Sequence, residues 1–140
     1  MRRDWELVRS ILFGVEELDV VSSAYHPENL PGGLQRGTSE GDKARFFKHY
    51  EHVALLVEAG LVEGVDGGRY PLSNHAGHEF RVIRPTRLTW RGHEFLDAIR
   101  NEQVWNQIQA KAVDKGGALS FEVIKELAVG LIKGAINIGT

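Results

Sequence analysis

The order of three segments limits the possible folds of this chain more than any other feature of its sequence. A helical stretch ends at Gly60, an arginine-rich segment follows, and a new helical pattern begins at Thr89. Glycine is needed at the first boundary because the chain must reverse there from a helix into a strand. Helix, strand, wing, returning strand and helix is the order of a winged helix. The sequence therefore predicts a mainly α fold with a small β-hairpin (α+β), a winged helix-turn-helix with two extra C-terminal helices.

Apolar spacing and turn residues predict the elements that precede the hairpin. Apolar side chains recur at helical spacing over residues 4–18 and again over residues 43–59. A group of β-branched residues predicts a short strand at residues 19–25, and prolines and glycines predict a loop at residues 26–37. The sequence leaves open whether residues 39–59 form one helix or two.

The hairpin itself is predicted from alternation and turn chemistry. Residues 61–65 alternate like a strand, residues 66–68 supply a turn, and residues 80–83 form the returning strand. Pro85 interrupts the pairing because proline has no backbone N–H to donate. Thr89 is a suitable N-cap for the helix that follows the hairpin.

Two further helical patterns complete the chain, at residues 102–114 and 120–136. They predict a winged-helix core over residues 1–100 and a helical extension over residues 101–140, packed on the same domain. The charges of the last helix cover only about a third of its circumference, which is less than a solvated surface helix needs. Such a helix is either deeply packed or half of an interface, and we expect a homodimer that forms through it.

Charge is unevenly distributed along the chain. The formal net charge is −2, which does not by itself indicate a nucleic-acid partner. Between Arg69 and Arg91, however, five arginines accompany a single acid, Glu79. Arginine suits phosphate because its planar guanidinium binds two oxygens at once. The predicted contacts with double-stranded DNA come from the central helix and from the wing, and they are Arg45, Lys48, His52, Arg69, Arg81, Arg84 and Arg87.

The same residues are equally compatible with a solvated helix face and a hairpin kept soluble by arginine. Glu51 and Glu58 lie beside the proposed DNA-reading face and weaken the DNA hypothesis. The leading function is DNA binding in phage or prophage regulation. The alternative is a non-enzymatic protein-interaction module that binds a host or phage protein. A continuous cationic stripe on the folded surface favours DNA, whereas interrupting acids or a buried helix face favour the interaction module.

Several other classes of site lack the residues they need. His49 and His52 are three positions apart, as are His75 and His78, but a zinc site needs three or four converging ligands. There is no cysteine, no glycine-rich phosphate loop and no nucleophile elbow, so we expect no metal, no cofactor and no enzymatic activity.

No long apolar run indicates a signal peptide or a membrane span, so we expect a cytoplasmic protein. The residues expected as core aromatics are Trp5, Trp90 and Trp105.

Four stretches of the chain resemble a domain-of-unknown-function family carried by bacteriophages and integrated prophages. They are residues 2–9, residues 52–61, the block from Leu88 to Arg100, and the tail from Val104-Trp105 through residues 117–131. The resemblance implies a winged-helix fold and a bacterial host cytoplasm, but it implies no established activity and no catalytic residues. This chain departs from the family in a longer insert at residues 27–43, which affects the expected length of the second helix.

Overall fold

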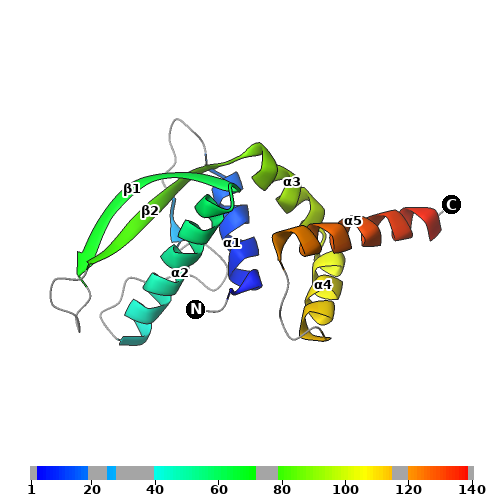
Figure 1. Ribbon diagram of the computed structural model, residues 1–140, viewed down its shortest axis with the longest axis horizontal. Coiled ribbons are helices and arrows are strands. Elements are labelled where there is room, and N and C mark those ends of the chain that lie inside the picture. Colours follow the sequence, from blue (N-terminus) through cyan, green and yellow to red (C-terminus); the bar gives the residue numbers. More distant parts are fainter. Residues whose placement is uncertain (1–2, 19–24, 28–39, 72–78, 115–119, 139–140) are drawn as a thin grey trace. The chain divides into compact units, whose positions relative to one another are not determined.

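A computed structural model describes residues 3–18, 25–27, 40–71, 79–114 and 120–138 (Figure 1). Its elements in chain order are α1 (Trp5–Glu16), α2 (Glu40–Glu58), β1 (Val62–Pro71), β2 (Glu79–Leu88), α3 (Trp90–Ile99), α4 (Glu102–Asp114) and α5 (Phe121–Ile138). The predicted mainly helical fold with a two-stranded antiparallel hairpin is confirmed. The strand expected at residues 19–25 and the loop at residues 26–37 lie almost entirely outside the described residues.

The chain divides into two compact units, residues 1–93 and residues 94–140, and the boundary falls inside α3. The predicted boundary after residue 100, and the packing of the extension on the core, stay predictions. Over the described ranges, no helix combines the length and the apolar character that crossing a bilayer requires.

Helix α1 begins where the sequence predicts. The carboxylate of Asp4 accepts a hydrogen bond from the backbone N–H of Leu7 at 3.1 Å, which satisfies one of the unpaired donors of the first turn. The apolar face of the helix is buried and packs against α2 and β2. The buried side chains of this face are Val8, Ile11, Leu12 and Val15.

Helix α2 is continuous from Glu40 to Glu58, so one helix occupies the stretch that the sequence left open. It ends in a Schellman motif at Gly60, whose φ of 76° lies in the left-handed region. The N–H of Leu61 donates to the carbonyl of Leu56 at 3.0 Å, and the N–H of Gly60 donates to the carbonyl of Val57 at 3.0 Å. The chain therefore reverses directly into β1, as the glycine predicted.

The two strands of the hairpin are longer than the sequence predicted, with ten residues in each. The prediction of a turn at residues 66–68 is wrong. A register shift between Asp66 and Arg69 lies there instead, and β1 continues beyond it. Gly68 has a φ of 107° and its N–H donates to the carboxylate of Asp66 at 2.9 Å, so the glycine accommodates a bulge and not a reversal. Pro85 is tolerated because it lies beside the other register shift, opposite Gly64.

Aromatic side chains fasten the distal half of the hairpin to α2. Tyr70 and Phe80 are directly opposite each other in the register. The ring of Tyr70 lies 5.1 Å from that of Phe46, and the ring of Phe80 lies 4.9 Å from that of Phe47. The hairpin consequently runs alongside α2, as Figure 1 shows for the green strands and the teal helix. An isolated two-stranded hairpin is only marginally stable, so these aromatic contacts hold the hairpin in place.

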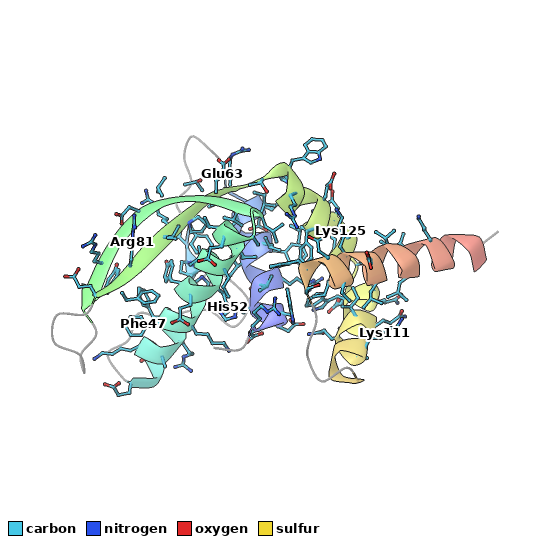
Figure 2. All side chains as sticks on the ribbon, in the orientation of Figure 1. Phe47, His52, Glu63, Arg81, Lys111 and Lys125 are labelled. Atoms are coloured by element: carbon cyan, nitrogen blue, oxygen red, sulfur yellow. The ribbon has the colours of Figure 1, made fainter. Side chains whose placement is uncertain are left out.

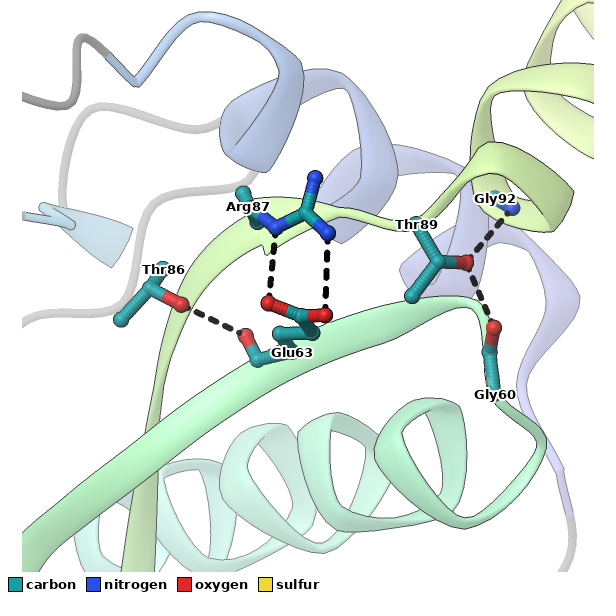
Figure 3. Close-up of polar contacts among 6 residues, drawn as sticks. All are labelled: Gly60, Glu63, Thr86, Arg87, Thr89 and Gly92. Atoms are coloured by element: carbon teal, nitrogen blue, oxygen red, sulfur yellow. Dashed lines mark hydrogen bonds and ion pairs between the residues drawn. The ribbon is translucent and has the colours of Figure 1, made fainter.

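A junction of three backbone segments fixes the start of α3 (Figure 3). The hydroxyl of Thr89 accepts from the N–H of Gly92 at 3.0 Å, which confirms Thr89 as the N-cap. The same hydroxyl donates to the carbonyl of Gly60 at 2.5 Å, and the N–H of Thr89 donates to the carbonyl of Leu61 at 3.0 Å. The end of α2, the start of β1 and the start of α3 are therefore tied together.

The second unit has its own core, formed by the end of α3 with α4 and α5. The ring of Phe95 lies 5.1 Å from that of Phe121, and Lys125 pairs with Glu94 at 3.1 Å. The hydroxyl of Ser120 accepts from the N–H of Val123 and so caps the start of α5. The buried side chains of this unit include Leu96, Ile99, Trp105, Ile108, Ile124 and Ala128.

Candidate nucleic-acid interface

The two cations predicted to face DNA from α2 are exposed, and each is paired with a carboxylate. The guanidinium of Arg45 lies 2.7 Å from the carboxylate of Asp42, one turn earlier on the same helix. The ammonium group of Lys48 lies 2.8 Å from the carboxylate of Asp4 at the start of α1. Their positive charges are therefore balanced locally by acids that belong to the same face of the molecule.

The prediction that His52 is exposed and faces DNA is wrong, because its side chain is 0% exposed. The Nε2 atom of His52 accepts from the backbone N–H of Asp4 at 2.9 Å, and its Nδ1 atom lies 2.7 Å from the carbonyl of Lys48. Arg45 points in almost the same direction around the helix axis, but it lies two turns earlier. The start of α1 covers His52, whereas Arg45 is exposed.

On the hairpin, Arg87 forms the best-defined ion pair. Its guanidinium binds both carboxylate oxygens of Glu63, at 2.7 and 3.0 Å, from the directly opposite position of the hairpin (Figure 3). The hydrogen bonds from Arg87 hold the pKa of Glu63 below its ordinary value. The guanidinium fork that would take up two phosphate oxygens is thus already occupied by a carboxylate.

The other arginines of the hairpin differ in their surroundings. Arg81 lies 3.7 Å from the carboxylate of Asp66, and Arg69 lies 3.7 Å from that of Glu79. Arg84 is exposed, and no acidic partner accompanies it among the residues that the structure describes. The arginines predicted to contact DNA from the wing all lie on β1 and β2, but three ion pairs join them to acids of the same two strands. Figure 2 labels one such arginine, Arg81, and one such acid, Glu63, on this hairpin.

The strand register explains why the sequence overestimated the basic character of this region. The arginine-rich segment begins at Arg69, so Glu63 and Asp66 fall just outside it. Antiparallel pairing brings both acids back onto the arginines of β2. The sequence could have predicted this pairing, because a hairpin places the residues before its turn, here the two acids of β1, opposite the residues after it.

One exposed residue was missed by the sequence argument. Trp90, which was expected in the core, is 80% exposed at the first position of α3. Trp105 is 1% exposed and confirms the expectation for that position. The first residue of a helix often points away from the face that the helix buries. The position of Trp90 at the start of the predicted helix was therefore the sequence feature that could have indicated its exposure.

Over the described ranges, no group of three or more histidine, cysteine, aspartate or glutamate side chains could hold a metal ion. His49 is 4% exposed, and its Nε2 atom lies 2.6 Å from the hydroxyl of Tyr25, so it is a buried, hydrogen-bonded histidine. His75 and His78 lie outside the described residues. The expected absence of metal, cofactor and catalytic residues stays a prediction.

Comparison with known proteins gave two matches. A family model described as "Hypothetical protein (DUF2513)" matches residues 2–118. A protein of Haemophilus influenzae named "Uncharacterized protein" is 33% identical over 132 residues, which cover 94% of this chain and 96% of that relative. No solved structure matches the chain.

Proposed function

This chain belongs to the DUF2513 family, and we propose that it is a non-enzymatic protein-interaction module built on a winged-helix scaffold. One observation supports this choice over DNA binding. Most of the cations that a winged helix would present to phosphate are paired with carboxylates. DNA would have to displace those carboxylates, and their charges would repel its phosphates. The paired cations are Arg45, Lys48, Arg69, Arg81 and Arg87.

The winged-helix scaffold is supported by the order of the elements around the hairpin. Helix α2 ends in a Schellman motif, β1 and β2 pair as a long hairpin, and α3 begins at a cap tied back to Gly60. Helix α2 stands in the place of the recognition helix. The residues between α1 and α2, where the sequence predicts a strand and a loop, lie almost entirely outside the described residues.

Trp90 is the anchor that this proposal assigns to the partner. Tryptophan is enriched among the residues that dominate binding energy at protein interfaces. The backbone that carries Trp90 is fixed on one side by the Thr89 cap and on the other by Gly92, which packs against Leu61. A large aromatic side chain on a rigid backbone loses little conformational freedom when it enters a partner's pocket.

The test measures DNA and protein binding side by side. We expect no binding of a random duplex pool at tens of micromolar protein and low salt. We expect a nuclease-resistant partner to be captured from bacterial host lysate by the wild type and by the His93→Ala control. Trp90→Ala should lose that partner, because His93 is also exposed on α3 but is a smaller, polar side chain. Capture that does not depend on Trp90 would contradict the assignment of the anchor.

DNA binding by the wing is the second candidate, and the surroundings of Arg84 favour it. If DNA is bound, each lost phosphate contact should lower the salt slope of log affinity by about 0.9. Arg84→Ala should then flatten the slope by about one unit, and joint replacement of Arg81, Arg84 and Arg87 by up to about three. Saturable duplex binding with these slopes would promote DNA binding above the interaction module.

The proposal includes a homodimer formed through α5. Ile124 and Ala128 are buried, but no described side chain beyond Ala128 in this helix is, and Val129 is 37% exposed. We expect light scattering to give a dimer mass for the wild type. Leu131→Glu should give a monomer because it places a charge on the apolar face.

The matched control for the dimer is Lys133→Glu, on the exposed face of the same helix, which should leave the dimer intact. A wild type that stays monomeric across micromolar concentrations would contradict the dimer.

The proposal also places the protein in the cytoplasm of a bacterial host as the product of a phage or prophage. The absence of cysteine supports this location, because the fold needs no oxidising compartment. Fractionation of host cells tests the location.

A further inference from the structure

Two buried histidines of α2 connect that helix to two separate segments near the N-terminus. His52 is 0% exposed and binds the start of α1, while His49 is 4% exposed and binds Tyr25. We propose that these histidines form a proton-sensitive clamp, which holds the start of α1 and Tyr25 against α2 only while both imidazole rings are neutral. The proposal rests on the hydrogen bonds of the first unit and is independent of the proposed function.

The two contacts of His52 fix its tautomer. The carbonyl of Lys48 can only accept, so the Nδ1 atom of His52, at 2.7 Å, carries the hydrogen. The Nε2 atom is then the acceptor for the backbone N–H of Asp4 at 2.9 Å. Protonation of Nε2 would set one N–H donor against another, and the bond that holds the N-cap of α1 would be lost.

His49 makes the second contact of the clamp. Burial raises the pKa of the Tyr25 hydroxyl, so this group stays protonated, and its oxygen lies 2.6 Å from the Nε2 atom of His49. Burial also lowers the pKa of His49 to about 4, and the charge of His52 adds to this effect. The two histidines share one side of α2, so protonation of both would place two cations side by side.

The charged groups around the clamp do not cancel this effect. Asp4 and Lys48 face His52 and are paired with each other at 2.8 Å, so one attracts a proton on the ring and the other repels it. His49 faces the rings of Tyr25 and Tyr50, at 5.7 and 5.2 Å. In the described part of the chain, no carboxylate is paired with His49. A cationic His49 would therefore be buried without compensation.

The pH range of the clamp follows from the sign of the shift at His49. A base whose pKa is lowered in the closed state binds more protons once that state opens. The clamp is therefore fully effective above the ordinary histidine pKa of 6.5, and it weakens as the pH falls from there to about 4. That difference in pKa corresponds to an increase in the opening equilibrium of up to about 300-fold for His49 alone.

The test follows backbone amide exchange at Asp4 and Leu7 between pH 7 and 4, corrected for intrinsic exchange rates. We expect these amides to open more as the pH falls in the wild type, because a proton on the Nε2 atom of His52 removes the acceptor of the Asp4 N–H. In the double variant His49→Gln, His52→Gln, the opening of these amides should be the same at pH 7 and at pH 4. Glutamine offers an amide oxygen as an acceptor and does not titrate. The control His93→Gln removes an exposed histidine and should behave as the wild type does.

A second measurement needs no variant. The ¹⁵N shifts of the imidazole nitrogens at pH 7 should identify a neutral His52 that carries its hydrogen on Nδ1. Hydrogen on Nε2, or a charged ring at that pH, would overturn the clamp. The same holds if the double variant and the wild type open with the same pH dependence.

Discussion

Replacement of Gly92 with alanine should lower the free energy of unfolding by about 3 kcal/mol or more. A Cβ atom at this position would lie 2.0 Å from the carbonyl oxygen of Leu61. That oxygen belongs to the backbone and accepts the N–H of Thr89, so it cannot move without breaking the junction at the start of α3. The loss should appear as a lower midpoint in urea denaturation followed by circular dichroism.

Gly130 provides the matched control for this prediction. It lies within α5, and a Cβ atom added there meets nothing within 4 Å. Gly130→Ala should raise stability by about 0.5–1 kcal/mol, because alanine loses less conformational entropy in a helix than glycine does. Similar effects of the two substitutions would show that the close approach of Gly92 to Leu61 is absent in solution.

Leu56→Ala should lower the free energy of unfolding by about 2–5 kcal/mol. Leu56 is 0% exposed on the inward face of α2, and its carbonyl accepts the N–H of Leu61 in the motif that ends the helix. The substitution removes apolar contacts and leaves a cavity, whereas the backbone bond remains. The prediction is checked by chemical denaturation and by a thermal melt.

Leu55 is the neighbouring control, because it is only partly buried on the same helix. Leu55→Ala should cost clearly less than Leu56→Ala, since less apolar surface returns to water. A melt of Leu56→Ala that stays within a degree or two of the wild type would mean that the inward face of α2 is wrongly assigned.

The sequence alone determined the features that depend on neighbours within one turn or one reversal of the chain. The start and the apolar face of α1, the end of α2 at Gly60 and the Thr89 cap all lie where the sequence placed them. Each of these depends on contacts between residues three to five positions apart, or on the conformational freedom of one glycine. The extents of β1 and β2 were predicted less well, because a glycine bulge and a glycine turn contain similar residues.

Only the tertiary structure decided the character of the candidate site. Arg87 is paired with a carboxylate 24 positions away, and His52 is buried beneath a segment 48 positions away. A helical wheel gives the direction of His52 but not how far along α2 the start of α1 reaches. A count of charges along the chain gives the arginines of β2 but not the acids that the register of β1 sets opposite them. Local sequence specifies where a helix begins and ends and in which direction its side chains point. The burial and the charge pairing of those side chains depend on which distant segment of the chain covers each face.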